Sequence, residues 1–285
     1  MDIRTARSDQ EAAAARQWDQ AAAGWNAHSP LIREWLRLAT DAMISCANIS
    51  PGMRVLDVAA GAGDQTLDVA TRVGPEGAVL ATDFSPAILA YAAANASAAG
   101  LRNVDTCVAS AERLPLDDAS FDAAICRLGL MLMPRPAVAL REIRRILKPG
   151  ARLAALVFSD IGSNPCLAIM MRVAAAHAGA TPGDPYRPGS LVSLGKPGLL
   201  AATLGRAGFS HVVTTRMPAP MVLPSLRHYT DFVRDSGAPV VALLAHLSPS
   251  ARAQAWAEIE DQLGVFSTPN GWSGPNELLL ATGVT

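Results

Sequence analysis

A glycine-rich turn between two apolar segments is the first place where residue types and spacing suggest chemistry. Residues 53–68, MRVLDVAAGAGDQTLD, pass from a short apolar run through alanine and glycine into helical spacing, which predicts a strand, a tight turn and a helix. Gly61 and Gly63 let the backbone turn sharply and leave no side chain between it and a ligand. In doubly wound sheets, such turns point helix amides at a nucleotide beyond the carboxyl ends of the strands.

A carboxylate follows the next predicted strand. The segment GAVLATDF ends in Asp83, about twenty residues beyond the glycines, where a ribose-binding acid stands in a βαβ nucleotide site. Two vicinal hydroxyls are two donors, and one ionised carboxylate accepts both. The alternative role for Asp83 is to cap the following helix. A dinucleotide fingerprint would need glycine or alanine at position 66, where Thr66 stands, so the pattern disfavours a pyrophosphate ligand.

This arrangement resembles motif I of the class I S-adenosylmethionine (SAM) dependent methyltransferases, of the ubiquinone and menaquinone methyltransferase type. The resemblance rests on Asp57 within the strand and on Ala59, Gly61 and Gly63 at alternate positions. Ala59 replaces the first glycine usual in class I enzymes, a departure that the ubiquinone and menaquinone type shares. Further matches in the same order are the pairs Leu-Pro at 114–115 and Phe-Asp at 121–122, the helix RPAVALREIRRILKPG and the strand ARLAALVF. The resemblance therefore covers residues 53–158.

The resemblance implies SAM as cofactor, with S-adenosylhomocysteine as product and the methionine part at the glycine turn. It also implies that Phe84 and Ile88 border the adenine, and that the segment WNAHSP closes over the cofactor. Ser110 stands where the family has an acid that meets the adenine amino group, and Glu112 is a second candidate for that contact. The expected cofactor contacts are Trp25, Asp57, Ala59, Gly61, Gly63, Asp83, Phe84, Ser110, Ala111, Glu112 and Arg127.

Arg127 ends the fourth predicted strand, beside the expected reaction centre. It can orient a substrate carboxylate or the methionine carboxylate, or pair with a surface acid. Family members that methylate adenine or glutamine amino groups carry Asn or Asp, two prolines and an aromatic here, and CRLGLM has none of them. A general base stays unassigned. The catalytic candidates are His28, Arg127, Tyr186 and His228, with His177 and Tyr229 as further acid–base groups.

Composition narrows the ligand classes. The chain has 285 residues, half of them hydrophobic, a formal net charge of −1 and no basic cluster beyond REIRRILK, so a nucleic acid partner is not expected. The four cysteines form no CxxC pair, which argues against zinc and against a disulfide scaffold. A polar start and no long apolar run predict a cytoplasmic protein without a membrane span.

The alternation of strands and helices predicts an α/β, Rossmann-like, doubly wound sheet of about seven mostly parallel strands with a helical cap. We expect an N-terminal helical cap at 1–50, a SAM-binding core at 51–160, and lid insertions plus the final strands at 161–285. Helices are predicted at 163–179 and within 225–264. The segment HVVTTRMPAPMVL is predicted as one strand, NELLLATG as a last antiparallel strand, and the proline-rich stretch 181–198 as a lid or binding loop.

The predicted function is methyl transfer from SAM to the oxygen, carbon or nitrogen of a small, hydrophobic organic molecule, without a metal ion. Two alternatives share every motif above: a SAM-binding enzyme that catalyses another reaction, such as a cyclisation, and a non-enzymatic SAM-binding protein. The sequence leaves open whether the protein is a monomer or a homodimer.

Overall fold

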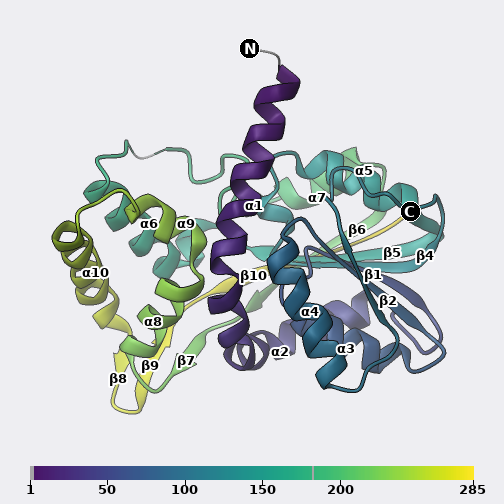
Figure 1. The fold of residues 1–285 in the computed structure, drawn as a ribbon, viewed down its shortest axis with the longest axis horizontal. Helices are drawn as coiled ribbons and strands as arrows, with labels where there is room; N and C mark the ends of the chain where they lie inside the picture. The colour runs from purple at the N-terminus through teal and green to yellow at the C-terminus, as the bar shows by residue number, and fades with distance from the viewer. Residues whose placement is uncertain (1–2, 182) are drawn as a thin grey trace.

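A seven-stranded sheet is the centre of the computed structural model, which describes residues 3–181 and 183–285 (Figure 1). Its order is β3-β2-β1-β4-β5-β10-β6, and only β10 runs antiparallel to its neighbours, which confirms the predicted sheet and its last strand. The strands are β1 (Arg54–Val58), β2 (Ala78–Asp83), β3 (Val104–Val108), β4 (Phe121–Arg127), β5 (Leu147–Phe158), β6 (Ser210–Pro218) and β10 (Glu277–Val284).

Helices cover both faces of this sheet, which is why its central strands read as continuous apolar runs. One face carries α2 (Ser29–Cys46), α3 (Asp64–Val73) and α4 (Pro86–Ala98), and the other carries α5 (Pro136–Ile146) and α7 (Leu199–Arg206) (Figure 1). The parallel strands put the ends of β1, β2 and β4 at one edge of the sheet.

A second group of elements lies beside that edge (Figure 1). It contains α6 (Pro165–His177), α8 (Leu226–Ser236), α9 (Ala238–Leu244), α10 (Pro249–Leu263) and a small sheet of β7 (Met221–Leu223), β9 (Gly271–Gly274) and β8 (Ser267–Thr268). The long helix α1 (Ile3–Ala27) runs between the two groups and contacts α4 on one side and α8 on the other. Short 3₁₀ turns complete the structure at Leu130–Leu132, Ile161–Ser163 and Gly264–Phe266.

The structure corrects one predicted strand and refines two helical regions. The segment HVVTTRMPAPMVL is not one strand: β6 ends at Pro218, and Met221 starts β7 in the small sheet. Proline has no amide for a strand ladder, so Pro218 and Pro220 break the pairing. The helix expected at 163–179 spans Pro165–His177, and the region 225–264 is divided into α8, α9 and α10. Pro182, in the predicted loop, lies outside the described residues.

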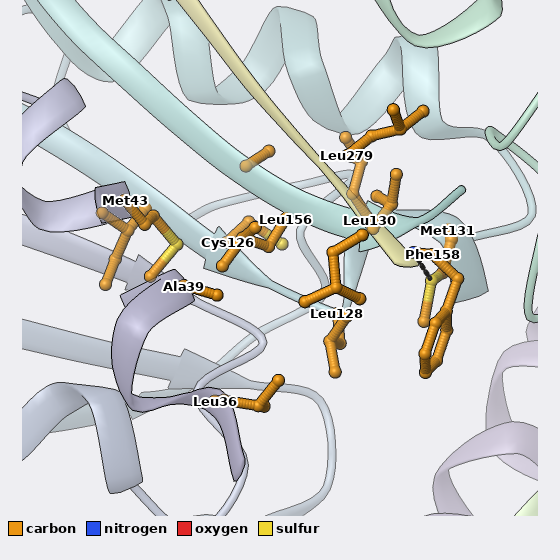
Figure 2. Packing of buried hydrophobic residues seen from close by; sticks show 14 of the residues in the cluster. Leu36, Ala39, Met43, Cys126, Leu128, Leu130, Met131, Leu156, Phe158 and Leu279 are labelled. Atoms are coloured by element: carbon orange, nitrogen blue, oxygen red, sulfur yellow. Dashed lines mark hydrogen bonds between the residues drawn. The ribbon is translucent and has the colours of Figure 1, made fainter. Parts of the chain in front are cut away.

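The apolar side of α2 fixes this helix to the sheet. Leu36, Ala39 and Met43 are buried against β4 and β5, beside Cys126 and Leu156 (Figure 2). At the far end of the same cluster, the backbone amide of Phe158 donates to the sulfur of Met131 at 3.4 Å (Figure 2). Trp35 stacks on the Phe158 ring at 6.2 Å between centroids. This packing places α2 over the end of β4.

None of the helices formed by the described residues is long and apolar enough to cross a membrane.

Candidate functional site

The glycine turn after β1 has the left-handed backbone that its composition predicts. Ala59, Gly61 and Gly63 have φ angles of +55°, +59° and +88°. A Cβ atom on Gly63 would lie 3.0 Å from the backbone of Ala92 in α4, so a side chain there would push α4 away. Gly61 faces Trp25 of α1, whose indole nitrogen would lie 3.4 Å from an added Cβ. Only a residue without a side chain leaves the Gly61 backbone open to a ligand.

Asp57 locks this turn onto the strand. Its carboxylate is fully buried and accepts hydrogen bonds from Thr66 Oγ1 at 2.6 Å and Gln65 Nε2 at 3.1 Å. Burial raises the pKa of Asp57 to about 6, and the hydrogen bonds from Thr66 and Gln65 oppose the shift. At the position where a dinucleotide fingerprint needs glycine or alanine, Thr66 therefore holds the buried Asp57 carboxylate.

Asp83 stands at the end of β2, next to the turn. Its side chain accepts from the amides of Gly61 and Ser85, both at 3.0 Å. Burial raises its pKa, and these amides oppose the shift. Each carboxylate oxygen has two lone pairs, so Asp83 can accept hydrogen bonds beyond those from these amides. The N-cap of α4 is Ser85, whose hydroxyl accepts from the amide of Ile88 at 3.2 Å, so capping is not the role of Asp83.

A small cavity of about 30 Å³ lies between the turn and the helices above it. Trp25 from α1 and Leu36 from α2 cover it, and the end of β4 closes the opposite side. Small-molecule pockets hold roughly 300–1,000 Å³, so this cavity is too small, as it stands, to hold a ligand of that class. Its lining consists of Trp25, Leu36, Ala59, Ala60, Gly61, Gln65, Arg127 and Leu128.

Arg127 reaches this cavity from the end of β4, with only 4% of its side chain exposed. Nη1 donates to Thr40 Oγ1 at 3.1 Å and Nη2 donates to Asp64 Oδ2 at 3.4 Å. The hydroxyl of Ser29 donates to the other oxygen of Asp64. Burial raises the pKa of Asp64, and the charge of Arg127 opposes the shift. Arg127 thus pairs with a buried acid and not with a surface acid.

The expected adenine side lies around the end of β3. The amide of Ala109 donates to the Asp83 carbonyl at 2.9 Å, which brings the segment 109–112 beside β2. The Ser110 hydroxyl accepts from the Glu112 amide at 3.3 Å. Arg135 occupies the Glu112 carboxylate through its backbone amide at 2.9 Å and its Nε at 2.6 Å, so Ser110 is the less engaged of the two candidates. Two other expected contacts, Phe84 next to Asp83 and Ala111 between Ser110 and Glu112, are half-buried.

The catalytic candidates do not converge. His28, in the turn between α1 and α2, pairs with Asp235 of α8 at 2.9 Å, and its ring meets the Phe232 ring edge-on at 5.3 Å. Of all these candidates, Arg127 alone lines the cavity. The others have local partners: Tyr186 with Asp160, His228 with Ser225, His177 with Glu258, and Tyr229 stacked on Trp272.

Metal chemistry has no ready ligand set in the part of the chain that the structure describes. No group of three or more His, Cys, Asp or Glu side chains there is arranged to hold a metal ion.

Sequence comparisons place the similarity in the amino-terminal two thirds of the chain. Residues 32–173 match the model of the ubiE/COQ5 methyltransferase family. The ubiquinone/menaquinone biosynthesis C-methyltransferase UbiE of Bordetella avium is 41% identical over 118 residues, 41% of this chain and 46% of that protein. The protein of the same name from Ectopseudomonas mendocina is 40% identical over 139 residues, 48% of this chain and 52% of that protein. The match thus spans about half the length of these relatives.

Solved structures support the fold over a larger range. The YcgJ protein of Bacillus subtilis has a TM-score of 0.58 at 20% identity, and the similarity covers 87% of this chain and 98% of YcgJ. The [4+2]-cyclase SpnF has a TM-score of 0.56 at 20% identity, with 93% of this chain and 96% of SpnF covered. At such identities these neighbours establish the architecture alone.

Proposed function

We propose, from the membership of this chain in the ubiE/COQ5 methyltransferase family through residues 32–173, that it transfers a methyl group from SAM to a small organic molecule. The observation that carries the proposal is the hydrogen bond from the Gly61 amide to the Asp83 carboxylate at 3.0 Å. It sets a carboxylate with free lone pairs beside an open backbone turn at the carboxyl edge of a parallel sheet.

The residues present suit SAM. Asp83 offers acceptors for the two ribose hydroxyls, and Ser110 lies on the side where the adenine would extend. The turn from Ala59 to Gly63, locked by Asp57, would hold the methionine part. When bound, SAM supplies a methyl group already activated by its sulfonium. Because the closed cavity is about 30 Å³, we propose that Trp25 and α1 move aside for the cofactor to enter.

The protein contributes alignment and exclusion of water. Holding a nucleophile in line with the methyl group and the leaving sulfur supplies roughly 7–11 kcal/mol of the barrier through proximity and orientation. Leu36 and Leu128 form apolar walls next to the turn, and Trp25 covers it. No described acid–base side chain other than Arg127 lines the cavity, so we leave a general base unassigned.

The acceptor is proposed to be small and hydrophobic. The acceptor would approach the methyl group from the side of three buried side chains: Met131 just after β4, Phe158 at the end of β5 and Met170 of α6. The relatives named as quinone C-methyltransferases make carbon methylation of a quinone precursor the finer form of this proposal. However, the family match ends at residue 173, and α8, α9, α10 and the small sheet lie beyond it.

We assign the parts of the chain accordingly. Residues 51–160 bind the cofactor, residues 1–50 cap it, and residues 161–285 supply the lid, the acceptor side and the last strands of the sheet. The tie between Tyr186 and Asp160, with an O–O distance of 2.5 Å, anchors the loop at 183–190 to the end of β5. From this attachment we propose that the loop borders the acceptor.

The test is a search for turnover with radiolabelled SAM and fractions of hydrophobic metabolites. Transfer of label with formation of S-adenosylhomocysteine supports the proposal. SAM binding without S-adenosylhomocysteine from any fraction would favour the cyclisation or sensor alternatives, and no SAM binding would refute all three.

Activity should survive EDTA. Loss on chelation with recovery in magnesium would mean that the acceptor class is wrong. Gly61→Val, which places a branched side chain against Trp25, is the matched inactive control.

A further inference from the structure

Arg127 is the single ionisable residue in the lining of the cavity, as the structure describes it. A buried guanidinium is costly unless anions or other acceptors surround it. Every other lining residue is apolar, a glycine or an amide. Arg127 is therefore the one lining group able to recognise an anion by charge.

Arg127 uses only part of its hydrogen-bonding capacity on Thr40 and Asp64. Arginine has five N–H donors in a planar arrangement that matches a carboxylate in bidentate fashion. Here Asp64 is contacted by one nitrogen at 3.4 Å, longer than the roughly 2.7–2.9 Å of a strong charge-assisted bond. Ser29 holds the other Asp64 oxygen, so Asp64 cannot turn to meet the guanidinium with both. Arg127 donates to no other side chain among the described residues, so its remaining N–H groups can meet a ligand in the cavity.

The topology of the sheet indicates which part of a ligand arrives there. β1 pairs with β2 on one side and with β4 on the other, so Asp83 and Arg127 flank the glycine turn from opposite sides. Their strands are two spacings apart, roughly 10 Å. A nucleoside whose ribose lies at Asp83 must direct its amino-acid tail across the end of β1. The far end of that tail reaches Arg127.

We propose that Arg127 binds the α-carboxylate of the methionine part of SAM, with Asp64 as the positioning residue that holds the guanidinium at the cavity. This inference rests on the proposed function and deepens it. Thr40 and Ser29 both belong to α2, so the same network joins the carboxylate site to the helix that covers the cavity. An acceptor carboxylate at Arg127 is the competing assignment. It is disfavoured because Arg127 and the turn residues Ala59, Ala60 and Gly61 line one shared cavity.

The experiment compares SAM with decarboxylated SAM, which lacks only the carboxylate, by titration calorimetry on the full chain. Wild-type protein should bind SAM about 30-fold more tightly, the equivalent of about 2 kcal/mol for a buried charge-assisted pair. Arg127→Met should lose about the same factor for SAM and keep its affinity for decarboxylated SAM within threefold. Arg33→Met is the matched control, because Arg33 lies on α2 and pairs with Asp68 of α3 at 2.6 Å, but in solvent.

Each outcome decides the inference. Equal affinities of wild-type protein for the two ligands would overturn it without any variant, so a folding defect in Arg127→Met cannot protect it. An equal loss of both ligands in a folded Arg127→Met protein would also overturn it, and would indicate a structural role. Failure of wild-type protein to bind SAM at all would instead refute the proposed function, and this inference with it.

Discussion

The backbone of Gly129 lies against the side chain of Ala59. A Cβ atom on Gly129 would lie 2.4 Å from the Cβ of Ala59 and 3.3 Å from the sulfur of Cys126. The two residues follow neighbouring strands, β1 and β4, and both loops contain strained backbone, with φ of +55° at Ala59 and +59° at Leu128. The alanine side chain at position 59 therefore makes glycine necessary at position 129.

The first prediction is a double-mutant cycle on this pair. Gly129→Ala should lower the free energy of unfolding by about 1–3 kcal/mol, because the added methyl group overpacks a rigid contact. Adding Ala59→Gly should recover most of this loss, since it removes the opposing Cβ and glycine adopts a positive φ freely. Urea denaturation of the four proteins measures the coupling. Simply additive effects would show that the neighbours relax independently and that the contact is unimportant.

The second prediction concerns the ribose acid. Asp83→Ala should weaken SAM binding by about 2–4 kcal/mol, because it removes charge-assisted acceptors in an enclosed site and frees the Gly61 amide. Asp122→Ala is the matched control. That carboxylate also accepts a backbone amide, from Arg54 at 2.8 Å, but it lies at the opposite edge of the sheet. Calorimetry should show SAM affinity unchanged in the control; unchanged affinity in Asp83→Ala would remove Asp83 from the site.

The third prediction is a pH dependence that belongs to Asp57. Burial raises its pKa from 3.8 to about 6 despite the hydrogen bonds from Thr66 and Gln65 and the charge of Arg127. Between about pH 4 and pH 6 the folded protein thus keeps a proton that the unfolded chain has released. The protonated Asp57 side chain therefore stabilises the folded protein fully below pH 4. This contribution is lost as the pH rises through 6, which lowers the free energy of unfolding by about 3 kcal/mol.

In Asp57→Asn the side chain at position 57 is neutral at every pH, so this variant should not lose stability between pH 4 and pH 6. The free energy of unfolding of the variant, relative to wild-type protein, should rise by about 3 kcal/mol from pH 4 to pH 7 and then stay level. Burial also raises the pKa of Asp64 and Asp83, but those groups are present in both proteins, so most of their contribution cancels in the difference; what remains is the Coulombic coupling of Asp83 to Asp57. A difference that stays constant over this range would mean that Asp57 titrates normally.

Local patterns were sufficient to predict the sheet. Strands such as β1 and β4 are buried on both faces, so they read as short apolar runs, and the prolines and glycines between elements mark the turns. The small sheet of β7, β8 and β9 was missed because its strands have two to four residues each. Segments this short carry no periodicity, and only tertiary contacts form them.

The geometry of the candidate site was predictable where residues act through the backbone, and much less so where side chains meet. Gly61 and Asp83 have a fixed spacing in a βαβ unit, and the structure joins them as that spacing predicts. The partner of Arg127 is Asp64, 63 positions away in sequence, and the pairing depends on how β4 and α3 pack. The Arg135 contact that occupies Glu112 likewise arises from loops folding back, which no sequence pattern signals.

The last prediction is that α1 must move for the cofactor to enter. In the structure Trp25 covers a cavity of about 30 Å³, and α1 is held to α4 by Asn95 Nδ2 donating to Asn26 Oδ1 at 2.8 Å. A bismaleimide bridge between cysteines at 26 and 95 should keep α1 in place, in a background where the half-buried Cys46 and Cys107 are replaced by serine.

The bridged protein should bind SAM at least about a hundredfold more weakly than the same variant capped singly with N-ethylmaleimide, a difference of about 3 kcal/mol or more. The physical reason is that a ligand of this size needs roughly ten times the volume that the closed cavity offers. Calorimetry and mass spectrometry of the bridge provide the readout. Equal binding by the bridged and capped proteins would show that the cofactor enters by another route, past α2 or the loop at 183–190, with α1 fixed.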